Sequence, residues 1–294
     1  VDSTEDASEI FKNQKEIILQ SIDGFPALVS DPWLNARITT LHACSDLWAC
    51  GAKLSSAQVL ISLPKVNDEF QDYLFSQSLK SIKFTIEELG GELLGGHTFE
   101  TRNFASKPLE FGMDISLSVQ GIIKNGKKPW KKNGLKSGDI LLLSRPLGVG
   151  IIFAAQMQNI NLFNSTNLVY KSLRTSQQFL LDQIYQLQDN LGENIINAAT
   201  DITGFGFIGH LKEMVKSSNL QRKSHNLNEI KAVLNLMSFN TYPNVMELIR
   251  KGVKSTLFDG NKKIYDEILE KEFGQREIIF DLEEDLSAGK ISDK

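Results

Sequence analysis

Residues 200–211 read TDITGFGFIGHL, and this stretch sets the interpretation of the whole chain. Its glycines, Gly204, Gly206 and Gly209, have the spacing G-x-G-x-x-G, which is typical of a dinucleotide-binding turn between a strand and a helix. Such a turn needs a buried strand before it, and the preceding ENIINAATDIT lacks one. The acid at Glu229 lies at a suitable distance, but it opens a stretch with a helical pattern, NEIKAVLNLM. A dinucleotide site is therefore the less favoured alternative, and Asp201 becomes the candidate for chemistry.

Composition excludes several classes of function. The 294 residues suggest two domains, and the net charge of -4 gives no general attraction to nucleic acid or to anionic membranes. No apolar run approaches the roughly 20 residues of a membrane-spanning helix. Cys44 and Cys50 cannot form a disulfide framework, so we expect buried thiols in a reducing, cytoplasmic location. The chain starts with Val1 in the middle of a pattern, and we expect it to be a piece of a longer protein.

Residues 1–124 alternate strand and helix patterns, which predicts a mixed α/β or α+β layer structure. Strands are expected for EIILQSI, AQVLISLP, ELLGGHT (running into a glycine turn) and LEFGMDISLSVQGII. Helices are expected for the segment from Asp31 to Gly51 and for DEFQDYLFSQSLKSIKFTIEELGG.

The lysine-rich segment KNGKKPWKKNGLKSGD marks the boundary to a second domain over residues 125–294. A nucleic-acid patch is conceivable there, but a solvated hairpin or an interdomain loop is favoured. After it we expect a strand at ILLLSRP and then mostly helices, with a frayed or truncated polar end at DLEEDLSAGKISDK.

Acids and short polar residues gather in the first half of the chain. Asp6 lies in TEDAS, Asp23 ends a strand, and Asp46 shares a helical stripe with Asn35, Thr39 and His42. Short polar groups with one carboxylate suit a site of limited room better than a solvated face. The LLGGHT segment places two glycines after a strand, where backbone N–H groups can point at phosphate oxygens; a structural turn is an equally good interpretation.

Several stretches occur together in the order found in selenophosphate synthetases (selenide, water dikinases). They are EDAS, LQSIDGFPALVSDPWLNARITTLHACSDLWACGA, LLGGHTFE, GLKSGDILLLSRPLGVGIIFAA and ATDITGFGFIGHLKEM. The chain resembles this family of the aminoimidazole-ribonucleotide synthetase superfamily over about residues 3–217, and in particular the form fused behind an NADH-dehydrogenase-like flavoprotein domain. The resemblance implies a two-domain α/β (α+β) fold with a 1–124 ATP-binding and dimerisation domain and an incomplete 125–294 synthetase-like domain. The implied homodimer joins its N-terminal strands in an intersubunit barrel.

The resemblance also implies the activity and its residues. The family makes selenophosphate from selenide, ATP and water and releases AMP and phosphate. Its Mg²⁺ ligands match Asp6, Asp46 and Asp201, and the acid at its nucleotide site matches Asp23. The residues that contact ATP match Ser3, Thr4, Glu5, Gly96, His97 and Thr98, with Asp46 also beside the nucleotide. Scattered aspartates suit Mg²⁺, which takes a few carboxylates together with phosphates and water.

The chain departs from the family in three places. The glycine-rich segment with a catalytic Cys or selenocysteine and a Lys has no match, so no catalytic residue is assigned. His42 stands where the family often has Asn, and the late motif DPQTSGG has at most a remnant in FDLEEDLSAGK. We therefore expect this chain to bind Mg-ATP without full turnover.

Two other functions stay open at this point. One is a related superfamily enzyme with another substrate, such as a thiamine-phosphate kinase or a hydrogenase-maturation protein. The other is a non-catalytic nucleotide-binding or dimerisation module of a redox fusion protein. From the acids that match the family's Mg²⁺ ligands, we predict that Asp6, Asp46 and Asp201 converge. The strands AQVLISLP and EFGMDISLSVQG present apolar residues that a small half-barrel cannot cover alone, and we predict that they form a dimer interface.

Overall fold

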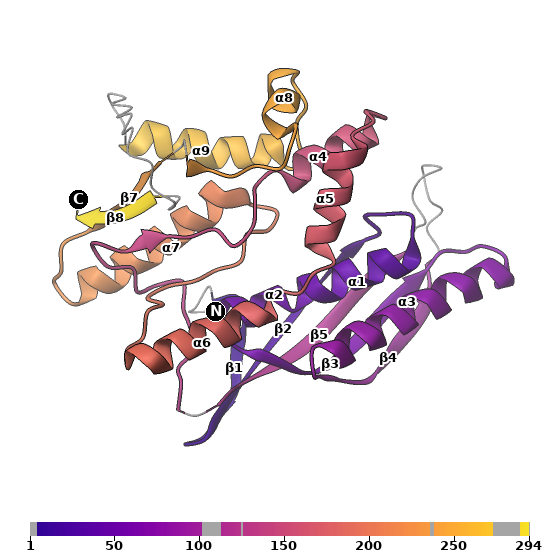
Figure 1. Ribbon diagram of the computed structural model, residues 1–294, viewed down its shortest axis with the longest axis horizontal. Helices are drawn as coiled ribbons and strands as arrows, with labels where there is room; N and C mark the ends of the chain where they lie inside the picture. Colours follow the sequence, from indigo (N-terminus) through magenta and orange to yellow (C-terminus); the bar gives the residue numbers. More distant parts are fainter. Residues whose placement is uncertain (1–4, 102–112, 125, 236–237, 273–288, 294) are drawn as a thin grey trace. The chain divides into compact units, whose positions relative to one another are not determined.

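The computed structural model describes residues 5–101, 113–124, 126–235, 238–272 and 289–293 of the 294-residue chain (Figure 1). The chain divides into two compact units. The first comprises residues 1–131 and 173–195, and the second comprises residues 132–172 and 196–294. The mixed α/β class expected from the sequence is confirmed.

The first unit is an open mixed sheet, mainly antiparallel, with helices packed on it. Its strands are β1 (Ser8–Lys12), β2 (Glu16–Pro26), β3 (Lys53–Leu63), β4 (Glu92–Glu100) and β5 (Asp114–Lys124). Its helices are α1 (Pro32–Ala43), α2 (Ser45–Ala49), α3 (Asp68–Glu88) and α6 (Gln178–Leu191).

The strand order in this sheet is β1-β2-β5-β3-β4. Among the described strands of this sheet only β3 and β4 run parallel, and the helix α3 connects them. Figure 1 shows α1 and α3 lying along one face of the sheet. The side chains alternate accordingly: Ile115, Leu117 and Val119 of β5 are fully buried, and the residues between them are partly exposed.

Capping side chains mark the starts of α1 and α3. Asp31 accepts a hydrogen bond from the Leu34 N–H at 2.7 Å, and Pro32 opens α1. Asn67 caps α3 in the same way, by accepting from the Phe70 N–H at 2.8 Å. The single helix expected up to Gly51 is instead interrupted at Cys44, so that a separate short helix carries Asp46.

The glycine turn expected in ELLGGHT is wrong, because the whole segment lies in β4. The pairing with β3 shifts by one residue at Leu94, which makes a β-bulge, and Gly95 has a φ of +139° there. A Cβ on Gly96 would lie 2.0 Å from the Val59 carbonyl oxygen. The two glycines therefore permit a bulge and a close approach of two strands.

The second unit has a small sheet and a set of helices. Its strands are β6 (Ile140–Leu141), β7 (Ile230–Leu234) and β8 (Gly289–Asp293) in the order β6-β8-β7. Its helices are α4 (Val149–Met157), α5 (Phe163–Leu173), α7 (Gly206–Ser224), α8 (Val245–Arg250) and α9 (Phe258–Glu272). Leu135, Met214, Ile230 and Ile291 form its hydrophobic cluster.

Three sequence expectations fail in this unit. The stretch after Glu229, expected to be helical, forms the strand β7. The end of the chain, expected to be frayed, supplies β8, which pairs with both β6 and β7. The strand expected at ILLLSRP is limited to the two residues of β6. The weak strand signal EIIF and most of FDLEEDLSAGK lie outside the described residues.

The lysine-rich boundary segment is partly built into the structure. Trp130 is buried, donates its backbone N–H to the Cys50 carbonyl at 3.1 Å, and packs on Tyr185 with ring centroids 5.5 Å apart. Lys132 is buried too and forms an ion pair with Glu213 at 3.1 Å. Trp130 and Lys132 of the lysine-rich segment therefore have structural roles within the fold.

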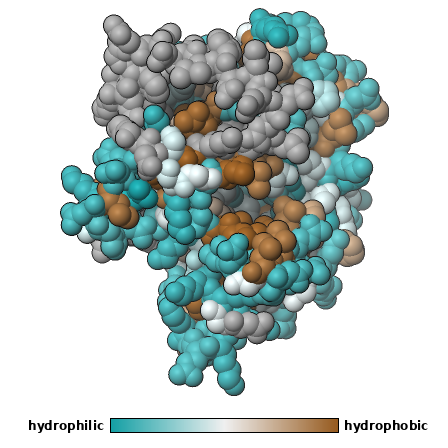
Figure 2. Space-filling view, turned by 60° about the vertical axis from the view of Figure 1, so that its left-hand side comes forward, coloured by the Kyte–Doolittle hydropathy of each residue, from teal (hydrophilic) through white to brown (hydrophobic). Residues whose placement is uncertain are grey.

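On the face drawn in Figure 2, hydrophilic residues predominate and hydrophobic ones gather in separate patches. Among the large apolar side chains exposed on the sheet face opposite α1 and α3 are Ile22 and Leu60. Within the described part of the chain, we find no helix with the length and apolar character needed to cross a membrane.

Candidate functional site

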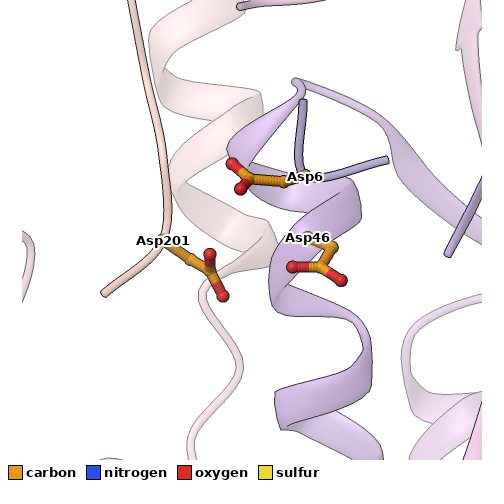
Figure 3. A group of neighbouring side chains, drawn as sticks. All are labelled: Asp6, Asp46 and Asp201. Carbon is orange, nitrogen blue, oxygen red and sulfur yellow. The ribbon is translucent and has the colours of Figure 1, made fainter. Parts of the chain in front are cut away.

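Two carboxylates of the first unit lie next to each other. Asp6 precedes β1 and Asp46 lies in the first turn of α2, and one carboxylate oxygen of each falls within 4.8 Å of the other (Figure 3). The Ser21 hydroxyl on β2 donates to the Asp46 carboxylate at 2.5 Å. Two partly exposed acids this close repel each other, and a hard cation relieves that repulsion.

The alternation of β2 places this polar group. Ile17 and Leu19 are buried on the helix-facing side of the strand, and Ser21 and Asp23 follow on the same side. This face of β2 thus changes from apolar to polar at Ser21 and Asp23, which contact Asp46 of α2 and His42 near the end of α1. Ser21 was missed by the sequence analysis; its signal was the polar continuation of an otherwise apolar alternation.

Asp23 is held by two donors. Its Oδ2 lies 2.9 Å from His42 Nε2, and its Oδ1 accepts from the Gly24 N–H at 2.6 Å. Burial opposes ionisation of this carboxyl, but the hydrogen bond and charge of His42, together with the Gly24 N–H, lower its pKa below the ordinary value. The His42 ring also packs on Phe25 at a centroid distance of 4.9 Å. A carboxylate fixed in this way can accept hydrogen bonds from hydroxyl or amino groups of a ligand.

The polar stripe predicted on one helix splits into two parts. Asn35 and Thr39 are fully buried, and they bind backbone groups: Asn35 accepts from the Leu28 N–H, and the Thr39 hydroxyl donates to the Asn35 carbonyl. Only His42 and Asp46 reach the polar end of β2. The first half of the stripe is therefore structural.

Cys50 is buried and is not a reactive thiol. Burial is the main cause that raises its pKa to about 12; a hydrogen bond from the Ala7 backbone opposes the rise, and the charges of Asp6, Glu5 and Asp46 add to it. The thiol therefore stays protonated near neutral pH and offers no thiolate ligand. A cation at the carboxylate pair would therefore find carboxylate oxygens and no thiolate from Cys50.

Asp201 belongs to the second unit and lies in the loop before α7 (labelled in Figure 3). Residues 192–205 contain no strand, so a dinucleotide-binding turn is excluded. Gly206 opens α7 with a φ of +69°, and Gly204 packs against Leu257. His210 is buried in the first turns of α7, and its pKa is lowered chiefly by burial.

The remaining predicted site residues are distributed as follows. Glu5 is half-buried beside Asp6, and Ser3 and Thr4 lie outside the described residues. Gly96, His97 and Thr98 lie on the edge strand β4, exposed to solvent. Because β5 and β3 separate β4 from β2, these three residues lie about 14 Å across the sheet from Asp23.

Comparison with known proteins places the chain in a family. The AIR synthase related protein family matches it in two parts, the N-terminal domain over residues 4–123 and the C-terminal domain over residues 136–238. A selenide, water dikinase of Aliarcobacter butzleri is 31% identical over 76% of this chain and 60% of its own length. Another, from Pelobacter propionicus, is 32% identical over 68% of the chain and 52% of its own length. The chain thus spans between half and two thirds of these relatives.

A solved structure shares the fold. The hydrogenase maturation protein HypE in complex with ATP matches with a TM-score of 0.63 and 12% identity, over 99% of this chain and 80% of its own. These findings confirm the resemblance to selenophosphate synthetases, and the chain belongs to the AIR synthase related protein family.

Proposed function

We propose that the chain carries the Mg-ATP site of a selenide, water dikinase, an enzyme that forms selenophosphate from selenide, ATP and water with release of AMP and phosphate. The proposal is supported by its similarity to selenide, water dikinases. The observation that carries it is the adjacent pair Asp6 and Asp46.

The donor set fits Mg²⁺. Mg²⁺ binds oxygen donors and usually takes one or two carboxylates together with phosphate oxygens and water. Asp6 and Asp46 offer such oxygens, and the protonated thiol of Cys50 does not compete. We propose Asp201 as the third ligand, brought to the pair by the second unit. When bound, Mg²⁺ would neutralise the phosphate oxygens of ATP.

The protein groups around this pair would orient the nucleotide. Ser21 holds the Asp46 carboxylate by its hydrogen bond, and His42 and the Gly24 N–H hold Asp23. An ionised, fixed Asp23 accepts hydrogen bonds from hydroxyl or amino groups of the nucleotide. Ser3, Thr4 and Glu5, next to Asp6 in the chain, are proposed as further contacts.

We propose that Gly96, His97 and Thr98 contact the phosphates from a second copy of the chain. Two strands, β5 and β3, separate them from β2 in their own sheet, so a neighbouring copy supplies them more directly. The outer face of the sheet supports a homodimer, because Ile22 is 74% exposed and Leu60 43% exposed there. Light scattering at tens of micromolar should give twice the chain mass, and a monomer would contradict this part of the proposal.

The proposed domain functions are nucleotide binding and dimerisation over residues 1–124 and a synthetase-like role over residues 125–294. Both cysteines are free and buried, which suits the proposed cytoplasmic location.

Isothermal titration tests the metal and nucleotide assignment. We expect ATP binding that depends on Mg²⁺, and a weaker Kd for Asp46→Asn and Asp201→Asn, because a neutral amide is a poorer ligand than a carboxylate. Asp182→Asn is the matched control, since Asp182 is exposed on α6 and pairs with Lys53. Unchanged binding in both site variants would refute the assignment. Selenide-dependent AMP formation by the full-length protein tests the reaction itself.

A further inference from the structure

Hydrogen bonds attach the loop that carries Asp201 to its own unit. The Thr203 N–H donates to His210 Nε2 at 3.1 Å, and the Gly206 N–H donates to the Thr203 carbonyl at 3.0 Å. The Asn261 amide donates to the Gly204 carbonyl at 3.0 Å. The first two of these contacts fix Thr203, two residues after Asp201, and the Thr203 hydroxyl also lies 3.3 Å from His210 Nε2. The direction of the Asp201 backbone therefore depends on how Thr203 is held.

The contact made by His210 fixes the state of its ring. A ring nitrogen that accepts from a backbone N–H must be unprotonated, so a neutral His210 carries its proton on Nδ1. The side chain is only 6% exposed, and among the described residues Nδ1 has no hydrogen-bond partner. A buried polar atom without a partner is costly and needs an explanation.

The acceptor role at Nε2 provides that explanation. Phe205 occupies the N-cap position before α7, and its side chain offers no hydrogen-bond acceptor. His210, in the first turns of α7, accepts instead from the Thr203 N–H that precedes the helix, and it packs on Phe205 with ring centroids 5.9 Å apart. The proton is left on Nδ1 because Nε2 has to stay free of one.

We infer that His210 is a positioning residue: as a neutral Nδ1–H imidazole it holds the backbone at Thr203 and thereby orients Asp201. The consequence for metal binding rests on the proposed function, whereas the backbone contact does not. His210 itself makes no contact with a metal or nucleotide in this role.

The tautomer is tested in the wild-type protein. Long-range ¹H–¹⁵N NMR spectra near neutral pH should show His210 as the neutral tautomer with its proton on Nδ1. An Nε2–H tautomer or an imidazolium would overturn the inference. This measurement needs no variant and no ATP.

Two substitutions of similar size separate the acceptor from the packing. His210→Gln keeps an acceptor oxygen on a flexible side chain, whereas His210→Leu fills the space without one. We expect the Thr203 amide to exchange with solvent at least about tenfold faster in His210→Leu and within about threefold of wild type in His210→Gln. The same substitutions at His225, exposed at the other end of α7, should leave Thr203 unchanged.

Metal binding supplies the second readout. The apparent Kd for Mg²⁺ at a fixed ATP concentration should rise about tenfold in His210→Leu, equivalent to about 1.4 kcal/mol, and stay within about threefold in His210→Gln. Equal Kd values for all three proteins, or an equal loss in both variants, would overturn the positioning role. If the wild type binds no Mg-ATP, the proposed function fails, and the exchange and tautomer measurements still decide the contact with Thr203.

Discussion

Replacing Gly96 by Ala should destabilise the first unit by pushing β4 away from β3. The new Cβ would lie 2.0 Å from the Val59 carbonyl oxygen and 2.9 Å from its carbon, and real Cβ contacts are essentially never under 3.0 Å. The atoms that clash include backbone, so no side-chain rotation relieves the contact. The two strands must separate by about 1 Å or more near Val59.

The expected loss of stability follows from the backbone hydrogen bonds between β3 and β4. A hydrogen bond of ordinary length does not survive a stretch of about 1 Å. Losing the two bonds nearest Gly96 costs about 2 kcal/mol at roughly 1 kcal/mol each, and disturbed packing adds to it. Among the described strands β4 lies at the edge of its sheet, so it can move outward without meeting another of them. We therefore expect a loss of about 2–3 kcal/mol, within the usual range for overpacking.

Urea unfolding followed by circular dichroism, with amide exchange of residues 56–63, measures this loss and its location. Gly260→Ala is the control, because nothing lies within 4 Å of its added Cβ on α9. That variant should be neutral or more stable by about 0.5–1 kcal/mol. If Gly96→Ala unfolds at the wild-type urea concentration, the close approach of β3 and β4 is wrong.

Two more predictions concern ionisation. Cys44 and Cys50 should not react with a thiol reagent at pH 8 in the folded protein, because both are buried and burial raises both pKa values. Both should react after unfolding. Rapid labelling of either cysteine in the native state would contradict this prediction. The lowered pKa of Asp23 means that its contribution to stability is present above pH 3.8, the ordinary value, and is lost as the pH falls through the lower folded value. The stability difference between wild type and Asp23→Asn should therefore shrink as the pH falls below about 4, and a constant difference in urea unfolding would contradict it.

Local signals predicted much of the first unit. The helices expected from Asp31 and from DEFQDYLFSQSLKSIKFTIEELGG correspond to α1 and α3, and the apolar–polar alternation expected in β5 matches its buried face. The glycine pair in β4 was misinterpreted as a turn because a bulge and a turn use the same residue type. The bulge is distinguished from a turn by the pairing of β4 with β3, which brings Gly96 against Val59.

The second unit was harder to predict because pairing decides its strands. Residues 230–234 read IKAVL, which includes good helix formers, and they become a strand through pairing with β8. The polar segment that forms β8 carries no strand signal of its own. Tertiary contacts override the local preference in both segments.

The candidate site was predicted as a set of acids, and the residues that support those acids were not. Asp23, Asp46 and His42 were identified from their positions on a strand and a helix. The hydrogen bond from Ser21 to Asp46 and the contact between His210 and Thr203 join residues that no local periodicity relates. Such contacts become visible only once the elements are packed.

The proposal that Asp6, Asp46 and Asp201 share one metal site is tested most directly by a double-mutant cycle on Mg-ATP affinity. Asp46→Asn, Asp201→Asn and the double variant are titrated with ATP at saturating Mg²⁺ and again without it. If the two carboxylates hold the same ions, the losses should be non-additive, with a coupling of about 1 kcal/mol or more that disappears without Mg²⁺. Losses that add within about 0.3 kcal/mol would show that the two acids act at separate places, and would contradict the shared site.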